Sequence, residues 1–175
     1  MFTRVLKSSP GCLMVIAAMF ANTTALADNL PQPNGEVVLT VTGAIGMTNS
    51  DEGARFDIPM LKALPQTKFT TGTIWTEDKS TFQGVLLKDL LEKVDAKGTM
   101  LQARALNDYA VEIPLTDAIL GGPIIAYLNN GKTMSIREKG PLWIVYPYDA
   151  KSAYRTEIIY SRSIWQLEEL TVTGD

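Results

Sequence analysis

The chain has 175 residues, a net charge of −3, a single cysteine and no histidine. Because the cysteine is Cys12, every residue after it lacks both a thiol and an imidazole. This composition excludes a Ser-His-Asp triad, a Cys-His pair, a zinc site of Cys and His ligands, and a disulfide in the main part of the chain. The excess of acidic residues makes a nucleic acid a poor partner.

Residues 1–27 are expected to be a cleavable signal peptide. Arg4 and Lys7 make the start positive, residues 12–21 are apolar, and residues 25–27, Ala-Leu-Ala, have the spacing of a cleavage site. Cleavage would leave 14 basic and 19 acidic residues, a net charge of −5. The apolar run is shorter than the roughly 20 residues that cross a bilayer. We therefore expect a periplasmic protein with no direct membrane insertion.

The rest of the chain is expected to form one domain. Residues 28–35 contain Pro31, Pro33 and Gly35, which predict a flexible N-terminal tether. Residues 36–175 then have the length of a single domain with one core.

The first half of this domain mixes strands with short helices. Residues 36–42 alternate apolar and polar side chains, which predicts a strand. Residues 57–64 are expected to form a short helix capped by Asp57. Residues 67–76 are rich in threonine and aromatic side chains and predict a second strand. Residues 85–94 have apolar side chains at helical spacing and make the longest predicted helix.

The second half is predicted to be mostly strands. A hairpin is expected over residues 100–115 with its turn at Asn107-Asp108, followed by one helical turn at Thr116-Asp117. Asn130-Gly131 is a strong hairpin signal. The other expected strands cover residues 124–128, 132–136, 142–148 and 163–173. The fold class predicted is α+β, mainly a β mixed sheet or barrel with a few helices.

Three stretches of the chain occur in a recognisable order. They are Ala-Leu-Asn-Asp-Tyr with Glu-Ile-Pro within residues 105–114, Asn130-Gly131, and Gly-Pro-Leu-Trp-Ile-Val-Tyr-Pro at residues 140–147. Phe-Gln-Gly-Val-Leu-Leu at residues 82–87 precedes them. Together they resemble the molybdopterin-binding domain of the sulfite oxidase fold over about residues 37–172. The resemblance implies a mixed α+β fold with a cleft for a pterin, which in the enzymes is part of a molybdenum cofactor.

The chain departs from the enzymes of this family at the metal. Those enzymes bind molybdenum through a cysteine thiolate, and residues 28–175 contain no cysteine, so no metal is expected. The chain is more similar to short, exported, stand-alone members of the family. Some of these resemble periplasmic proteins that bind a reduced pterin and report it to an inner-membrane enzyme of cyclic di-GMP control. The resemblance thus implies a reduced pterin as ligand and the periplasmic domain of an inner-membrane signalling protein as partner.

Two other functions stay open at this point. One is a molybdopterin-dependent oxidoreductase, or a subunit of one whose partner supplies what is absent here. The other is a structural or assembly protein that kept the fold and lost the ligand.

A pterin has a flat π face and an edge of hydrogen-bond donors and acceptors. Its pocket therefore needs an aromatic or guanidinium plane and a carboxylate or amide at the edge. The residues with this chemistry near the matching stretches are Trp75, Asn107, Asp108, Tyr109, Arg137, Tyr146, Tyr148 and Arg155. The alternatives are a core role for Trp75 and turn formation for Asn107 and Asp108, while Trp165 is assigned to the core. No residue is assigned a catalytic or metal-binding role.

Overall fold

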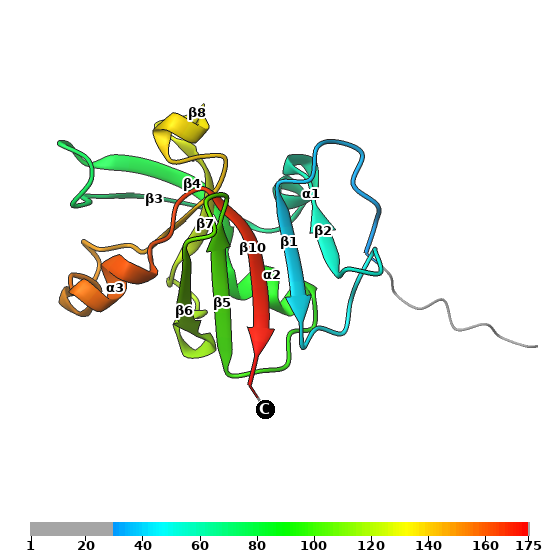
Figure 1. The fold of residues 1–175 in the computed structure, drawn as a ribbon. Helices are drawn as coiled ribbons and strands as arrows, with labels where there is room; N and C mark the ends of the chain where they lie inside the picture. Colours follow the sequence, from blue (N-terminus) through cyan, green and yellow to red (C-terminus); the bar gives the residue numbers. More distant parts are fainter. Residues whose placement is uncertain (1–29, 175) are drawn as a thin grey trace, which may run out of the picture.

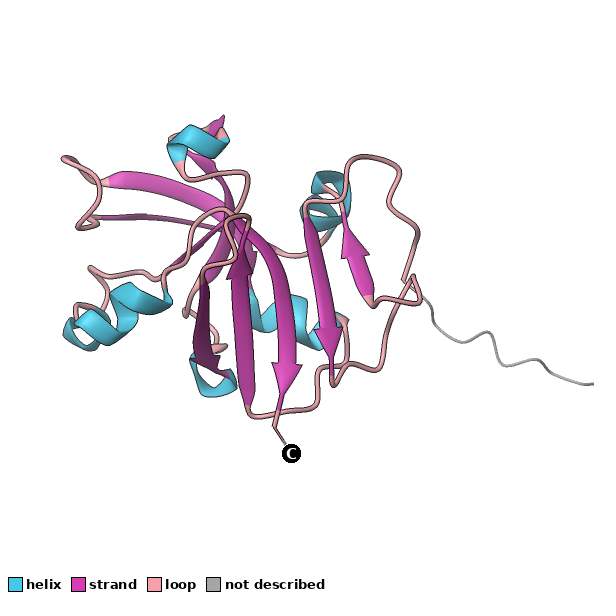
Figure 2. Ribbon diagram, in the orientation of Figure 1, coloured by secondary structure: helices cyan, strands magenta, loops and turns pink. Residues whose placement is uncertain are grey.

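Figure 1 shows the computed structural model of the chain, which describes residues 30–174. The signal peptide expected over residues 1–27 therefore lies outside the described residues. Two sheets and several short helices make up the fold (Figure 2). The prediction of a mainly β, α+β fold class is confirmed.

The first sheet has five strands and is mixed. Its strand order is β2-β1-β10-β5-β6, in which β1 and β10 are parallel and the other neighbours are antiparallel. The strands are β1 (Leu39–Gly43), β2 (Ala54–Phe56), β5 (Met100–Ala105), β6 (Ala110–Pro114) and β10 (Leu167–Thr173).

The second sheet is antiparallel. Its order is β3-β4-β7-β8, and β9 also pairs with β7. The strands are β3 (Gln66–Thr71), β4 (Ser80–Leu86), β7 (Ile124–Asn129), β8 (Lys132–Thr133) and β9 (Trp143–Val145). Figure 1 shows β3 and β4 reaching away from the first sheet, with α3 on the same side of the molecule.

The helices of the described residues are all short. They are α1 (Ile58–Ala63), α2 (Leu87–Lys93), α3 (Glu157–Arg162) and the 3₁₀ turns η1 (Leu115–Asp117), η2 (Ile136–Glu138) and η3 (Ser152–Tyr154). Within residues 30–174, no helix has the length and apolar character needed to cross a membrane.

One hydrophobic core joins the two sheets and the helices. Its largest fully buried side chains include Phe56 and Phe82 from strands and Trp143, Tyr146 and Tyr148 from the segment that includes β9. Helix α2 buries three leucines in the same core. The strand β9 segment therefore lies at the centre of the domain, where its aromatic residues can support a binding site.

Asp57 caps α1, as the sequence predicts. Its Oδ1 accepts a hydrogen bond from the Met60 N–H at 2.8 Å, and its Oδ2 accepts from the N–H groups of Asn34 and Gly35, both at 2.8 Å. These backbone hydrogen bonds, first that of Met60, lower the pKa of the Asp57 carboxyl against the opposing effect of its burial. One buried carboxylate thus fixes both the helix and the segment before β1.

The flexible tether was expected over residues 28–35, and for the described residues, 30–35, this expectation is wrong. The Leu30 side chain is only 3% exposed, and Asn49 donates a hydrogen bond to the Pro31 carbonyl at 2.7 Å. Gln32 donates to the Asn49 carbonyl at 2.6 Å. Together with the contacts to Asp57, these bonds hold the segment against the domain.

The longest predicted helix, residues 85–94, begins two residues before the corresponding helix of the structure, α2. Val85 and Leu86 are the last residues of β4, a strand that the sequence analysis missed, and α2 begins at Leu87. A side chain at Gly84 would place its Cβ 2.0 Å from the Ile125 carbonyl oxygen on the neighbouring strand. Gly84 therefore belongs to a close approach of two strands and not to a helix entry.

Other predicted strand boundaries differ as well. The strand expected over residues 67–76 ends at Thr71, the one expected over 132–136 ends at Thr133, and the one expected over 163–173 begins at Leu167. The strand expected over residues 36–42 begins at Leu39, and the one expected over 142–148 covers only Trp143–Val145. Helix α3 was not predicted at all. Trp75 consequently lies in the loop after β3 and not on a strand.

Candidate functional site

Trp75 stands at the centre of an aromatic cluster. Its ring centroid is 5.6 Å from that of Trp165, 5.7 Å from Trp143 and 5.8 Å from Tyr160, and all three pairs meet edge to face. Aromatic pairs of this geometry add stability beyond the area they bury. The indole of Trp75 is therefore held in one position, although it comes from a loop.

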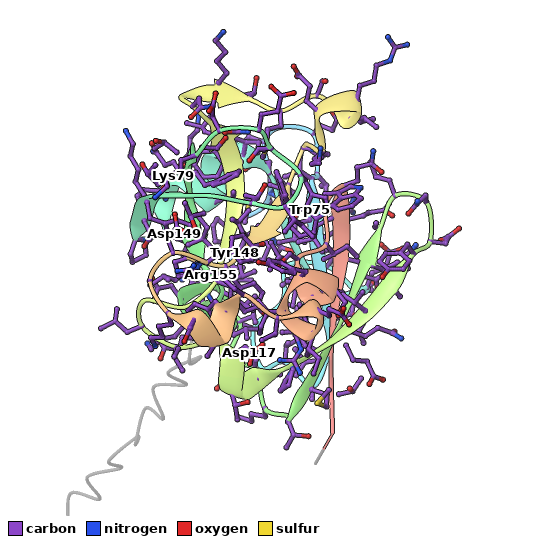
Figure 3. The ribbon with its side chains drawn as sticks, turned by 90° about the vertical axis from the view of Figure 1, so that its left-hand side faces the viewer. Trp75, Lys79, Asp117, Tyr148, Asp149 and Arg155 are labelled. Atoms are coloured by element: carbon purple, nitrogen blue, oxygen red, sulfur yellow. The ribbon has the colours of Figure 1, made fainter. Side chains whose placement is uncertain are left out.

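The loop that carries Trp75 is fixed at its beginning. Asp149 lies in the segment that follows β9. Its carboxylate accepts a hydrogen bond from the Gly72 N–H at 3.0 Å and forms an ion pair with Lys79 at 3.0 Å. Its own N–H donates to Thr71 Oγ1 at 3.0 Å. These groups lower the pKa of the Asp149 carboxyl, first through the Gly72 hydrogen bond. Figure 3 shows Lys79 and Asp149 together on one side of Trp75.

Beside Trp75 is a cavity of about 470 Å³, which we call the aromatic pocket. Side chains from the β5–β6 turn, from α3 and from the segment before β10 surround it. The lining residues are Trp75, Ala105, Asn107, Tyr109, Tyr160, Ser161, Ser163, Ile164 and Trp165. Tyr109 is 55% exposed and Trp165 is 36% exposed, so two aromatic side chains of the lining are accessible at the surface. The volume and the flat walls suit a bicyclic ring.

The polar groups of the aromatic pocket are neutral. Asn107 Oδ1 accepts a hydrogen bond from the Tyr109 N–H at 3.2 Å, and among the described residues its amide nitrogen makes no hydrogen bond. Ser161 donates to the Ile158 carbonyl at 2.7 Å, which leaves its oxygen able to accept a bond. No lysine, arginine, aspartate or glutamate is among the described residues that line the pocket. It can therefore stack a ring and hydrogen-bond its edge without an ion pair.

Tyr146 and Tyr148 do not line the aromatic pocket. The Tyr148 hydroxyl donates to Ser163 Oγ at 2.7 Å, and the Tyr146 hydroxyl donates to Asp117 Oδ2 at 2.7 Å. Burial is the first cause that raises the pKa of both phenols, so both keep their protons. Tyr148 supports the pocket from behind, because Ser163 is one of its lining residues.

Asp108 and Arg155 also lie outside the aromatic pocket. The Asp108 side chain is 86% exposed and pairs with Arg104 at 3.0 Å. The Arg155 Nε–H donates a hydrogen bond to the Tyr148 carbonyl at 3.1 Å, and Figure 3 labels both residues. Arg137 lines a different hollow, next to β8. Of the eight candidates, the structure brings Trp75, Asn107 and Tyr109 together in one pocket.

Several lining residues were missed by the sequence analysis. Tyr160 and Ser161 belong to α3, the helix that was not predicted, and Trp165 was assigned to the core. An N-cap signal was present: Thr156 accepts a hydrogen bond from the Ile159 N–H, with Glu157 following in the first turn. This signal predicts a helix that begins after Thr156, carries Tyr160 and precedes the final strand.

A molybdenum cofactor has a pterin part and a metal part, which need different binding groups. Two tryptophans, two tyrosines and the Asn107 amide match a flat ring with a polar edge. Residues 13–175 contain no cysteine and so offer no thiolate to the metal. Residues 30–174 also hold no group of three His, Cys, Asp or Glu side chains arranged for a metal. The described residues, 30–174, fit the ring and do not fit a molybdenum centre bound by a thiolate.

Comparison with known protein families agrees with the resemblance seen in the sequence. Among curated proteins, none matches the chain significantly. A family model described as the oxidoreductase molybdopterin binding domain matches residues 61–153, more than half of the chain. This span includes Trp75, Asn107 and Tyr109 of the aromatic pocket and ends before α3. The chain belongs to the oxidoreductase molybdopterin binding domain family.

Proposed function

We propose that this chain is an exported pterin-binding protein with no redox chemistry of its own. The observation that carries the proposal is the aromatic pocket, whose walls suit a pterin ring, in a chain whose domain has no thiolate for molybdenum. The ring stacks against the indoles and phenols, and the Asn107 amide and the hydroxyls bond its edge. A reduced pterin is the ligand that the resemblance to short exported family members supports.

The loaded protein then acts on a membrane partner. We place it as a ligand-dependent regulator of an inner-membrane enzyme of cyclic di-GMP control, docking on that enzyme's periplasmic domain. Exposed apolar side chains beside the pocket support a docking role: Ile74 precedes Trp75, and Leu106 and Tyr109 belong to the β5–β6 turn. A ligand that contacts the same turn raises the affinity of this protein for its partner only if it binds the form that docks more tightly than the form that does not.

The second candidate is a molybdopterin-dependent oxidoreductase or a subunit of one. The match to the oxidoreductase molybdopterin binding domain favours it. In that case the missing metal ligand would come from another subunit. Stoichiometric molybdenum with turnover of an oxidisable or reducible substrate distinguishes this candidate from the first.

Titration calorimetry on ligand-free protein tests the proposal. Reduced pterins are expected to bind, and Trp165→Ala is expected to weaken each of them by about 1–3 kcal/mol, since it removes a stacking surface. Ile158→Ala is the control, because Ile158 is 62% exposed on α3 and does not line the pocket. Absence of binding of any pterin at high micromolar concentration, with an intact circular dichroism spectrum, contradicts the proposal.

A further inference from the structure

The antiparallel sheet ends in a strand with a free side. Strand β3 covers six residues, and among residues 30–174 it pairs with β4 alone. Figure 1 shows it reaching away from the first sheet. Lys68 and Thr70 in this strand are exposed, whereas Thr71 at its end is buried. The open part of the edge is therefore the stretch before Thr71.

The hydrogen bonds of β4 show which backbone groups of β3 point away from it. Thr81 faces Thr70 in the register, but its carbonyl accepts from the Asn130 N–H at 2.8 Å, and its own N–H donates to Asn130 Oδ1 at 2.8 Å. Thr70 and Thr81 thus form a non-hydrogen-bonded pair, in agreement with the 2.8 Å contact between their hydroxyls. Because such pairs alternate along two antiparallel strands, the N–H and C=O groups of Lys68 and Thr70 point outward.

Gly72 agrees with this direction. It lies two residues after Thr70, so its N–H points to the same side, where it donates to Asp149 Oδ2 at 3.0 Å. The backbone groups of Lys68 and Thr70 have no such partner among residues 30–174. Two N–H groups and two carbonyls are therefore left for a further strand.

The other edge strands of the described residues are short or guarded. Strand β2 has three residues, and the Asn49 side chain bonds both the N–H and the carbonyl of Arg55, at 2.8 and 2.9 Å. Strands β8 and β9 have two and three residues, and β6 ends in Pro114, which has no N–H. Proteins protect sheet edges in these ways because a free edge pairs with other chains. The open part of β3 has neither a proline nor a bulge.

Lys68 determines the kind of strand that fits this edge. Its side chain is exposed opposite the neutral Gln83 of β4, and among residues 30–174 it takes part in no ion pair. A carboxylate at the facing position of an added strand pairs with this ammonium. On the other face, Phe69 is half-buried against the core, and an apolar side chain of the added strand covers its open flank. The matching strand therefore has an acidic residue next to an apolar one.

A second copy of this chain matches the edge poorly. Strand β3 contains no acidic residue, so two copies that pair through β3 place both Lys68 side chains on one face without a carboxylate. Like charges on the same face of paired strands are destabilising. A different protein that supplies the carboxylate is the better partner.

We propose that β3 is the edge on which the membrane partner docks, by adding an extended segment with alternating acidic and apolar side chains to this sheet. This docking rests on the proposed function, which supplies the partner. The loop from Gly72 to Trp75 joins the edge to the aromatic pocket. A ligand that fixes Trp75 and a strand that fixes β3 stabilise neighbouring parts of one segment, so binding of either favours the other.

Vesicles of the producing cell's inner membrane, with the periplasmic face outward, are the probe. Protein isolated from the exported compartment with its own ligand is expected to bind them, and protease treatment of the vesicles is expected to abolish binding. Protein-free liposomes are expected to bind none. Hydrogen exchange over residues 66–71 is expected to slow in the bound protein, while exchange in β2, at the edge of the other sheet, stays unchanged.

A proline separates the edge from the rest of the strand. Thr70→Pro removes an outward N–H and leaves the hydrogen bonds between β3 and β4 in place, so it is expected to weaken vesicle binding about tenfold and to leave pterin affinity unchanged. Glu112→Pro is the matched control. The bond from the Ala105 N–H to the Tyr109 carbonyl places the Glu112 N–H on the outer side of the edge strand β6.

The charge of the edge is tested separately. Lys68→Glu reverses the charge that faces the added strand and is expected to weaken vesicle binding about two- to fivefold, whereas Lys68→Gln is expected to weaken it less. Added salt is expected to reduce the difference between wild type and Lys68→Glu.

The outcomes distinguish this docking from the proposed function. If the vesicles bind wild type and Thr70→Pro equally and exchange in β3 stays the same, the protein docks through another surface and the proposed function stands. If the vesicles do not bind the loaded protein, docking on a membrane partner is wrong altogether, and calorimetry still decides whether a pterin binds. A dimer in sedimentation equilibrium that Thr70→Pro dissociates, with slow exchange of β3 in the absence of vesicles, would identify a second copy as the occupant and overturn the proposal.

Discussion

Asn107 and Asp108 are neighbours in one turn, and the structure separates their roles. Asn107 lines the aromatic pocket, while Asp108 faces solvent beside Arg104. The Asn107 oxygen is already bonded to the Tyr109 N–H, so the amide nitrogen is the group available to a ligand. An N–H donor of this kind matches the ring carbonyl of a pterin.

Asn107→Asp therefore tests recognition of the ring edge. The carboxylate keeps the bond to Tyr109 and loses the donor, so the affinity for pterins should fall by about 1–3 kcal/mol, because two acceptors then face each other. A diaminopteridine, which has an amino group in place of the ring carbonyl, should lose less. Asp108→Asn is the matched control and should leave both affinities unchanged. Equal losses for the two ligands, measured by calorimetry, would contradict this role of Asn107.

Asp57 makes a prediction about stability and pH. Asp57→Asn should lower the free energy of unfolding by about 1–3 kcal/mol, since its side-chain nitrogen would face the Asn34 and Gly35 N–H groups. The Asp57 pKa is lowered in the folded protein, so its stabilisation is complete above the unfolded value near 3.8 and is lost as the pH falls through the folded value.

Urea unfolding across the acid range measures this effect. The variant should show a smaller loss of stability on acidification than the wild type, because it lacks the titrating group. Asp51→Asn, in an exposed turn, should change stability by no more than about 0.5 kcal/mol. Parallel acid profiles for wild type and Asp57→Asn would exclude Asp57 as a main acid-sensitive group.

At the scale of elements, α3 links the aromatic pocket to the rest of the domain. It carries Tyr160 and Ser161 of the pocket, and Arg162 at its end donates to Asp117 Oδ2 at 2.9 Å. The Tyr146 hydroxyl bonds the same oxygen, so η1, α3 and the residue after β9 meet at one half-buried carboxylate. The position of α3 depends on this junction.

Arg162→Met should loosen α3 and lower pterin affinity together. Removing the guanidinium leaves Asp117 with one partner, which should cost about 1–3 kcal/mol of stability. Amide hydrogen exchange over residues 157–162 should accelerate more than exchange in β5. Glu157→Gln, a charge change on an exposed residue of the same helix, is the control. Unchanged exchange in α3 would show that the junction does not hold the helix.

The elements that the sequence predicts well are those with local signals. Asp57 caps α1, Asn107 and Asp108 form the β5–β6 turn, and Asn130 leads into β8. Strand β4 was missed because Val85 and Leu86 fit a helical pattern equally well. Their strand conformation depends on pairing with β7, a distant segment that no local pattern reports.

Gly84 shows this dependence and can be tested. Gly84→Ala should destabilise the protein by about 1–3 kcal/mol or more, because the new Cβ meets the Ile125 carbonyl and the Ala126 backbone, which cannot move aside separately. Gly72→Ala is the control, as its Cβ would lie 3.8 Å from its nearest neighbour, an Asp149 oxygen. Thermal unfolding of both variants measures the difference. Equal midpoints would contradict the close approach of β4 and β7.

For the whole molecule, the sequence predicted the fold class, and three of its eight candidate residues lie together in the aromatic pocket. These three, Trp75, Asn107 and Tyr109, were selected because they lie in or near the stretches that resemble the family. Tyr146 and Tyr148 have the same chemistry, yet both are buried with their hydroxyls bonded inside the domain. Trp165 was left out because exposure depends on how the segment before β10 packs, which the residue type does not reveal.

The residues of the whole domain also bear on the choice between a binding protein and an enzyme. A pterin without its metal requires only the aromatic pocket, whereas the molybdenum centre of the family's enzymes requires a cysteine thiolate, and residues 28–175 contain no cysteine. Regulation of a membrane enzyme further requires that the loaded and empty forms differ at the docking surface. Membranes should therefore retain the loaded protein more than the empty one, in a pull-down with and without added pterin.

Mass spectrometry and metal analysis of protein isolated from the exported compartment test whether the domain holds a pterin without molybdenum. A reduced pterin should be released in near-equal amount to the protein, together with less than about a tenth of an equivalent of molybdenum. Stoichiometric molybdenum released together with molybdopterin would contradict this expectation.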